Sequence, residues 1–123
     1  MKPIKLLFAM LLAFATFQSA SAQSDKTQRT IGIKTENIRV SGICSMDKRR
    51  IETAAYSIDG VKLAVWDEYS QVLTLKYSVF KKDAADNVQK KIASVGNDTE
   101  KCRADDTAYL KLPDCCRYQR KQS

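Results

Sequence analysis

The order in which hydrophobic spacing changes along the chain limits the possible folds more than any other feature. Apolar and polar residues alternate up to Ser41, where Gly42 interrupts the run. A helical pattern then places apolar residues on one face, at Ile51, Ala54, Ala55 and Ile58. Two short alternating runs follow over 61–66 and 72–77, and a second helical pattern comes after them, at Ala85, Val88, Ile92 and Val95. The predicted order is strand, helix, strand, strand, helix.

Polar residues and glycines mark where these elements begin and end. Asp47 is expected to cap the first helix, and Asp83 is expected to cap the second. Gly60 and Gly96 end the two helices. A fourth strand is expected over 99–103, although few of its residues are apolar. The order β-α-β-β-α-β predicts an α+β, ferredoxin-like fold, in which one antiparallel sheet carries two helices on one face.

The first 22 residues are typical of an export signal. Lys2 and Lys5 precede an apolar run over 6–17, and small residues stand before Gln23. This run is shorter than the roughly 20 residues that cross a bilayer. We therefore expect cleavage after Ala22 and no membrane anchor afterwards. The processed protein is expected in the periplasm or outside the cell, where thiols can oxidise.

The rest of the chain is long enough for one small domain. We expect a flexible lead-in over 23–34, a folded domain over 35–104 and a C-terminal extension over 105–123 that carries a cysteine pair. With 44% hydrophobic and 28% charged residues, the composition supports a packed core.

Composition and motifs exclude several classes of function. The chain contains no histidine, which excludes imidazole catalysis and histidine-ligated zinc. The sequence has no phosphate-binding loop, nucleophile elbow or dinucleotide motif, so we expect no enzymatic activity. The formal net charge is +7, but the basic residues are scattered and form no continuous stripe with interleaved aromatics. Nucleic-acid binding is therefore not expected.

The four cysteines are the strong soft ligands of the chain, and two motifs contain three of them. The loop after the first strand reads Gly42-Ile43-Cys44-Ser45-Met46-Asp47, and residues 112–118 read Leu-Pro-Asp-Cys-Cys-Arg-Tyr. These motifs resemble the heavy-metal-associated domain family, whose usual loop is G-M-x-C-x-x-C. They are similar in particular to an exported subgroup with the loop G-x-C-x-M-C and a later L-P-x-C-C-x-Y. The resemblance covers about residues 35–118.

The resemblance implies a ferredoxin-like domain that binds a soft metal ion, most often Cu(I). It is the fold of copper chaperones, of modules in metal-pumping ATPases and of the periplasmic mercury-binding protein. In such families the ion passes to a partner through shared thiolates, and basic residues near the loop, here Lys48, Arg49 and Arg50, steer an acidic partner. The partner implied is a membrane metal transporter or another metal-binding protein of the cell envelope.

One position departs from the family pattern. Cys44 matches the first ligand, but Asp47 stands where the family has its second cysteine. A carboxylate is a hard ligand and a poor substitute for thiolate toward Cu(I). Met46 can add a thioether sulfur, and Cys44 with Met46 still suits Cu(I). The alternative is that Met46 packs within the loop and Asp47 is a helix cap only.

Cys115 and Cys116 form the second group of candidate ligands. An antiparallel fourth strand would start the tail at the end of the domain opposite the loop, yet the chain between residues 104 and 115 is long enough to return. A three-sulfur site of Cys44 with this pair would replace the missing ligand and would suit Cu(I), Zn(II) or Hg(II). The alternative is a disulfide between Cys102 and one of the pair.

Three functions are compatible with these features. The first is an exported protein that binds a soft metal ion, with Cu(I) as the leading candidate, and acts as a carrier, chaperone or sequestering protein. The second is a protein-interaction module that kept the fold without the metal, which the replacement of a cysteine by Asp47 favours. The third is a thiol redox or sensor protein that uses Cys44, Cys115 and Cys116.

Overall fold

A computed structural model describes residues 32–121 of the chain. The predicted signal peptide and most of the lead-in lie outside these residues and stay predictions. The described elements, in chain order, are β1 (Ile33–Arg39), α3 (Ser45–Tyr56), β2 (Val61–Asp67), β3 (Val72–Ser78), α4 (Ala84–Ser94), α5 (Asp106–Leu110) and the 3-10 turn η1 (Asp114–Cys116).

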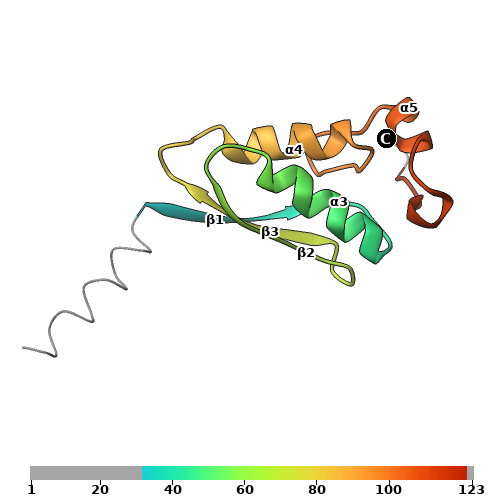
Figure 1. The fold of residues 1–123 in the computed structure, drawn as a ribbon, viewed down its shortest axis with the longest axis horizontal. Coiled ribbons are helices and arrows are strands. Elements are labelled where there is room, and N and C mark those ends of the chain that lie inside the picture. Colours follow the sequence, from blue (N-terminus) through green and yellow to red (C-terminus); the bar gives the residue numbers. More distant parts are fainter. Residues whose placement is uncertain (1–31, 122–123) are drawn as a thin grey trace, which may run out of the picture. The chain divides into compact units, whose positions relative to one another are not determined.

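The predicted fold class is confirmed. The three strands form one antiparallel sheet in the order β1-β3-β2. Figure 1 shows α3 and α4 side by side over one face of this sheet. The strand, helix, strand, strand, helix order read from the hydrophobic spacing is therefore the order in the molecule.

The core lies between this sheet and the two helices. Trp66, Leu73 and Leu75 from the strands are fully buried, together with Ile51 of α3 and Ile92 of α4. The Trp66 indole Nε1 donates a hydrogen bond of 3.0 Å to the carbonyl oxygen of Val40. Because buried aromatic and branched side chains dominate hydrophobic stabilisation, this cluster holds the sheet and the helices together.

The start of the first helix differs from the prediction. Asp47 is not its N-cap: α3 begins at Ser45, and Cys44 is the N-cap residue. The Asp47 carboxylate sits inside the first turn and accepts a hydrogen bond of 2.9 Å from the Ile43 backbone N–H. Asp83 is the N-cap residue of α4, as predicted, but its side chain makes no capping hydrogen bond.

The predicted fourth strand over 99–103 is wrong. That segment contributes one isolated bridge, between Val40 and Thr99. A local turn replaces the strand, because the Thr99 N–H donates to the Cys102 carbonyl oxygen over 2.8 Å and the Gln89 side chain accepts from the Lys101 N–H over 3.1 Å. Polar side chains that bond to nearby backbone compete in this way with strand pairing.

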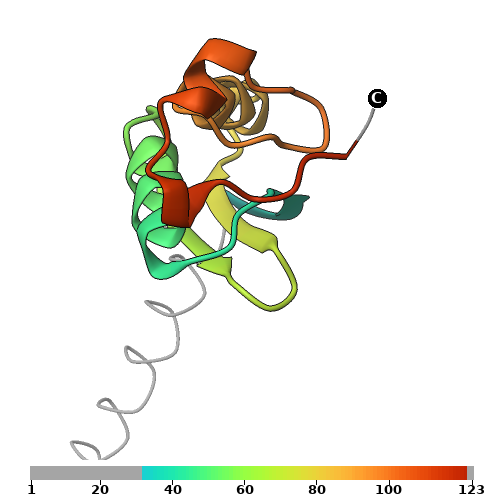
Figure 2. The same ribbon diagram turned by 90° about the vertical axis from the view of Figure 1, so that its right-hand side faces the viewer.

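The missing strand changes where the C-terminal tail begins. The Ser41 N–H donates to the Asp98 carbonyl oxygen over 2.9 Å, so the chain leaves the sheet beside the loop that holds Cys44. The tail therefore does not start at the opposite end of the domain, as a full strand would have required. Figure 2 shows the orange and red tail lying across the end of the molecule where α3 begins.

From Ile33 onward the chain forms one compact unit. The predicted division at residues 104 and 105 stays a prediction. Within residues 32–121, no helix combines the length and the apolar character that crossing a bilayer requires.

Candidate metal centre

The loop between β1 and α3 is held against the core by a glycine and a tryptophan. A Cβ atom added at Gly42 would lie 2.8 Å from the Trp66 ring, too close for any side chain. The Gly42 carbonyl oxygen accepts a hydrogen bond of 2.8 Å from the Gln71 side chain. The glycine therefore lets the loop press onto the ring, and this contact positions Cys44 at the start of α3.

Three thiols meet at the end of this loop. The ligand atoms of Cys44, Cys115 and Cys116 all lie within 4.8 Å of one another. The Cys44 Sγ is 3.2 Å from the Cys116 Sγ, and the Cys115 Sγ is 3.8 Å from the Cys116 Sγ. Cys116 is buried, Cys44 is half-buried and Cys115 is exposed. The cluster therefore combines a shielded pair with one thiol that faces solvent.

Met46 extends this cluster toward the surface. Its Sδ lies 3.7 Å from the Cys115 Sγ, and the residue is 49% exposed. The four sulfur atoms are all soft donors of the type that binds Cu(I). We call Cys44, Met46, Cys115 and Cys116 the sulfur cluster.

Asp47 lies beside the cluster but is fully occupied by other partners. It is completely buried, and its Oδ1 accepts hydrogen bonds from the Arg50 guanidinium over 2.7 Å and from the Asn97 amide over 3.1 Å. Its Oδ2 accepts from the Ile43 N–H and, more weakly, from the Cys44 thiol at 3.8 Å. A carboxylate with this set of donors acts as a support for the loop, since binding a metal would break these hydrogen bonds.

Arg50 connects this support to the tail. Its second guanidinium nitrogen, Nη2, lies 3.8 Å from the Cys116 Sγ. The same side chain therefore pairs with Asp47 and places positive charge beside a candidate ligand.

The Cys44 thiol is shielded by its surroundings. Burial raises the pKa of Cys44, and the backbone N–H groups of Asp47 and Met46 act in the opposite direction. A neutral thiol is consequently favoured at Cys44 in the metal-free protein. Metal binding therefore requires loss of that proton.

Tyr118 fixes the tail against the body. Its ring is 2% exposed, and its hydroxyl donates to the Gly96 carbonyl oxygen and accepts from the Asp98 N–H, both over 2.8 Å. Burial raises the pKa of Tyr118, so this hydroxyl stays protonated and keeps both bonds. With Leu112 and Cys116 the ring forms a second small apolar cluster, against which Cys44 packs.

An ion pair closes the tail behind this ring. The Arg120 guanidinium donates to both carboxylate oxygens of Asp98, over 2.9 and 2.8 Å, and its Nη1 donates to Asp106 over 2.8 Å. The guanidinium also lies 4.8 Å from the centre of the Tyr109 ring. These contacts return the tail to the body on the C-terminal side of the cysteine pair.

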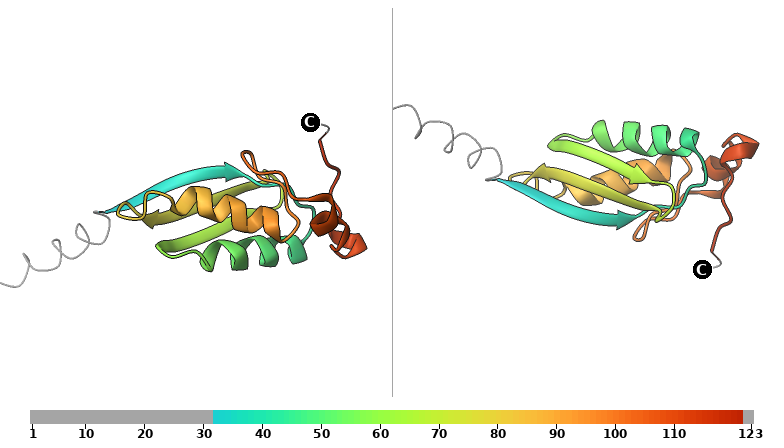
Figure 3. Two further views of the ribbon diagram at one scale, coloured as in Figure 1. Left: turned by 90° about the horizontal axis from the view of Figure 1, so that it is seen from above. Right: turned by 90° about the horizontal axis from the view of Figure 1, so that it is seen from below.

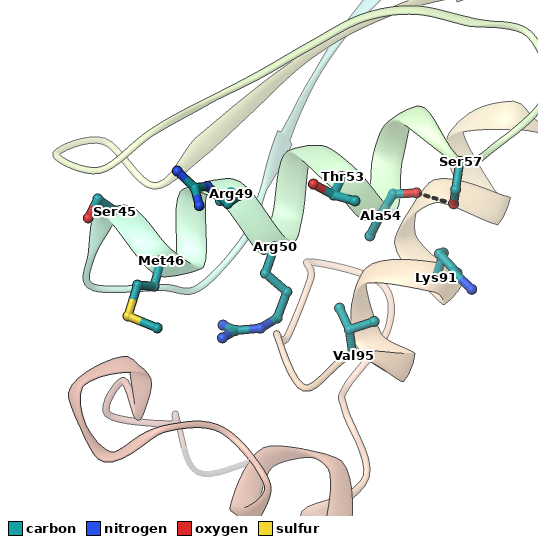
Figure 4. Close-up of a pocket in the computed structure, with 9 residues that line it drawn as sticks. All are labelled: Ser45, Met46, Arg49, Arg50, Thr53, Ala54, Ser57, Lys91 and Val95. Atoms are coloured by element: carbon teal, nitrogen blue, oxygen red, sulfur yellow. Dashed lines mark hydrogen bonds between the residues drawn. The ribbon is translucent and has the colours of Figure 1, made fainter.

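A groove of about 550 Å³ adjoins the sulfur cluster along α3. Figure 4 shows the lining side chains of Met46 and Arg50 below α3, with Lys91 of α4 and Val95, which follows α4, to the right of them. Arg49 is exposed at its rim, and no ion pair with Arg49 forms within the described residues. Lys48, by contrast, is held by Glu52 at 2.6 Å and by the Trp66 carbonyl oxygen at 2.8 Å.

The structure thus brings together four of the five predicted site residues. Cys44, Met46, Cys115 and Cys116 form the sulfur cluster, whereas the fifth, Asp47, supports the loop. Cys102 lies outside the three-thiol group, and all four cysteines are free thiols. That these residues hold a metal ion stays a prediction.

Sequence reasoning missed two residues around the cluster. Asn97 bonds to Asp47 and also donates to the Ser41 carbonyl oxygen over 2.9 Å, although it is far from both in sequence. The contacts of Arg50 with Asp47 and Cys116 were likewise not expected, while its implied role in partner steering stays a prediction. The i,i+3 spacing of Asp47 and Arg50 on a helix was the one local signal for this pair.

Comparisons with known proteins support the fold. No family model matches the sequence, and the curated proteins contain no match. Among solved structures, the chain is similar to a CopZ metallochaperone, with 27% sequence identity and a TM-score of 0.50; the match covers 54% of this chain and 98% of that one. A second similar structure is an NMR structure of a ZiaAN sub mutant, with 28% identity and a TM-score of 0.46, covering 55% of this chain and 94% of that one. The fold is like that of a heavy-metal-associated domain.

Proposed function

We propose that this protein is an exported carrier of a soft metal ion, with Cu(I) as its main cargo, and that it holds or passes this ion in the cell envelope. The observation that carries the proposal is the meeting of three thiols from two distant segments. The similarity to a structure titled a metallochaperone supports a metal-binding protein. The similarity of residues 112–118 to the L-P-x-C-C-x-Y motif of the exported subgroup supports it as well.

The spacing of the thiols suits a single bound ion. A metal about 2.3 Å from each of three sulfur atoms places those atoms about 4 Å apart. The three thiols lie within 4.8 Å of one another, so binding needs only small side-chain rotations. Zn(II) and Hg(II) fit such a sulfur set as well.

The chemistry of the neighbouring groups favours Cu(I) over Zn(II). The additional donor beside the thiols is the Met46 thioether, at 3.7 Å from the Cys115 Sγ, and thioether sulfur selects Cu(I). The Asp47 carboxylate lies 3.8 Å from the Cys44 Sγ, but it is committed to Arg50 and Asn97 and is not free to serve as a hard fourth ligand for Zn(II).

The differences in exposure suggest separate roles for the ligands. Cys44 and Cys116 retain the ion, since they are shielded and lie 3.2 Å apart. Cys115 and Met46 are exposed, so a thiolate from a partner can replace them first. Transfer then proceeds by exchange of one ligand at a time, without release of the free ion.

The partner best suited to this site carries acidic groups around its own thiolates. Arg49 and Lys91 are exposed at the groove beside the cluster and attract such a surface. A membrane metal transporter or another metal-binding protein of the envelope fits this description. Export by the N-terminal signal would place the protein in that compartment.

An anaerobic Cu(I) titration against a chromogenic chelator tests the proposal. The protein is taken after processing, from Gln23, and fully reduced. We expect one Cu(I) per chain, with tight binding lost in Cys44→Ser and in Cys116→Ser. Cys115→Ser should retain weaker binding and release the ion faster, because its thiol is the exposed one.

Cys102→Ser is the matched control, since Cys102 is a half-buried cysteine outside the cluster, and it should bind as the unmodified protein does. Parallel titrations with Zn(II) and Hg(II) rank the ions. If the unmodified protein competes with the chelator for none of the three ions, the metal function is refuted. A protein-interaction module without a metal then becomes the better explanation of the fold.

The distance of 3.2 Å between Cys44 and Cys116 favours a thiol redox function as the second candidate. In that function the two thiols would form a disulfide, losing two protons and passing two electrons to a disulfide oxidant, which is reduced to two thiols. Counting free thiols in protein isolated from the envelope separates the two functions. Four free thiols, of which bound Cu(I) protects the three of the cluster, support metal carriage, whereas a Cys44–Cys116 disulfide supports redox exchange.

A further inference from the structure

Most of one edge of the sheet is open. The strand order β1-β3-β2 leaves β1 paired on one side only. The segment around Thr99 reaches only the last residue of β1, through the bond from Glu100 to Arg39, and the residue after it, through the bridge to Val40. Figure 3 shows β1 along the free side of the sheet, with the orange segment beside its C-terminal end. An open strand edge is a template for pairing with another strand.

Backbone directions identify the residues that are available at this edge. The Val40 N–H donates to the Gln71 carbonyl oxygen over 2.9 Å, toward β3, while the Arg39 carbonyl oxygen accepts from Glu100 over 3.0 Å on the other side. Because successive residues of a strand alternate in direction, the N–H and C=O groups of Ile33, Thr35 and Asn37 also point outward. Within residues 32–121, no strand pairs with these three residues on that side.

The two edges of the sheet differ in how they are protected. β2, at the other edge, carries an irregularity between Val61 and Leu63, and such bulges disrupt pairing. β1 keeps an unbroken register with β3 from Ile33 to Arg39. Both outer strands pair on one side only, and β1 is the one whose register is unbroken.

We infer that β1 pairs with β1 of a second copy of this chain, antiparallel and centred on Thr35. In this register Thr35 lies opposite Thr35 of the second copy, and Ile33 lies opposite Asn37. All three residues point outward, so each pair can exchange its N–H···O=C bonds. The two sheets then join into one continuous sheet.

The charges on β1 select this register. Lys34 of each copy lies opposite Glu36 of the other, at positions where opposing side chains are closest. A shift of the second strand by two residues in one direction places Lys34 opposite Lys34, and a shift in the other direction places Glu36 opposite Glu36. Both shifts juxtapose like charges, which is destabilising, so a single alignment is favoured.

This dimer leaves both sulfur clusters accessible. The C-terminal end of β1 leads through the loop to Cys44, whereas the pairing is centred nearer the N-terminal end of the strand. An antiparallel arrangement therefore directs the two clusters to opposite ends of the assembly. The inference is independent of metal binding, and its failure would leave the proposed function intact.

Sedimentation velocity of the processed, reduced, metal-free protein over a dilution series tests the inference. We expect a monomer–dimer equilibrium. Thr35→Pro removes an outward N–H and leaves the bonds to β3 in place, so the dissociation constant should rise at least about ten-fold. Thr35→Ala keeps the N–H and is the matched control, and it should remain dimeric. Circular dichroism verifies that each variant is folded.

Charge-reversal variants test the register separately, and this test remains valid even if Thr35→Pro does not fold. Glu36→Lys alone should weaken the dimer, and adding Lys34→Glu to it should restore much of the association. In hydrogen exchange, the Thr35 amide should be protected in the dimer. A chain that stays monomeric at all concentrations, or a dimer that Thr35→Pro does not weaken, would overturn the inference. A monomer with a protected Thr35 amide would do so too, because residues 23–31 would then occupy the edge.

Discussion

In the body of the protein, over 33–96, large apolar side chains such as Trp66 and Leu75 are buried between a sheet and two helices. In the tail, over 104–121, Leu112, Cys116 and Tyr118 form a much smaller apolar cluster. Polar contacts hold the rest of the tail, above all those of Arg120. The body therefore depends on hydrophobic burial, whereas the tail depends on a few specific bonds.

This difference separates the two halves of the candidate site. The body supplies Cys44 and Met46, and the tail supplies Cys115 and Cys116. A change in the tail should displace Cys115 and Cys116 without unfolding the body. A change in the core should unfold the body and so disrupt both halves of the candidate site.

The largest effect is expected from Trp66→Ala. The Trp66 ring is fully buried and also packs against Gly42 of the loop that holds Cys44, so its loss should cost about 3–5 kcal/mol of unfolding free energy. Urea unfolding followed by circular dichroism measures this. Trp66→Phe, which keeps most of the apolar volume and loses the bond to Val40, should cost clearly less. Equal losses in the two variants would show that ring volume is not what stabilises the body.

A smaller and local effect is expected from Arg120→Ala. The change leaves the Asp98 carboxylate with fewer partners and should weaken docking of the tail by about 2–3 kcal/mol. Hydrogen exchange of the tail amides should accelerate, while the unfolding midpoint reported by Trp66 fluorescence should hardly move. Arg117→Ala is the control from the same segment, because Arg117 is exposed and, among residues 32–121, pairs only with Asp114 and the Leu110 carbonyl oxygen. If Arg120→Ala lowered the fluorescence midpoint as much as Trp66→Ala does, body and tail would unfold as one unit.

These two regions also differ in how well sequence reasoning predicted them. The body followed from hydrophobic spacing, because periodicity reports directly which residues face a core. The absence of the fourth strand did not, since it depends on Gln89 bonding to the backbone of a later turn. The role of Asp47 depends on Asn97, which the fold alone brings to it.

For the tail, the sequence could predict only that Cys115 and Cys116 are able to reach Cys44. Its motif and its reach allowed Cys115 and Cys116 to approach Cys44, and the structure brings them within 4.8 Å. The contacts that fix it, such as those of Tyr118 with Gly96 and Asp98, join residues with no periodic pattern between them. Spacing rules say nothing about such contacts.

Tyr118→Phe tests how much one hydroxyl group contributes to docking of the tail on the body. The ring still fills its place, but the Gly96 carbonyl oxygen and the Asp98 N–H each lose a partner, which should cost about 1–2 kcal/mol of tail docking. Hydrogen exchange at the Asp98 amide reports this loss. Tyr56→Phe is the control, since Tyr56 is an exposed tyrosine of α3. A protected Asp98 amide in Tyr118→Phe would mean that apolar packing, and not this bond, holds the tail.

The smallest effect is expected from mild acid, acting on Asp98. Burial of Asp98 opposes its ionisation, but the Arg120 guanidinium and the Ala104 N–H outweigh it and lower the pKa of this carboxyl below its ordinary value of 3.8. A carboxyl with a lowered pKa stabilises the folded state above that ordinary value, and the contribution is lost as the pH falls through the lowered one. Docking of the metal-free tail should therefore be constant near neutral pH and weaken below about pH 4.

The Tyr118 signals in a pH series of NMR spectra measure this step, with Trp66 as the reporter of the body. In Asp98→Asn the acid step should disappear, and the tail should be equally weakly docked at every pH. The contribution of Asp98 ionisation to tail docking is modest because the Asp98 side chain is 15% exposed, so water partly screens its pairing with Arg120. An acid step that persists in Asp98→Asn would assign the titration to another carboxylate, and Asp106, the second partner of Arg120, would be the next to replace.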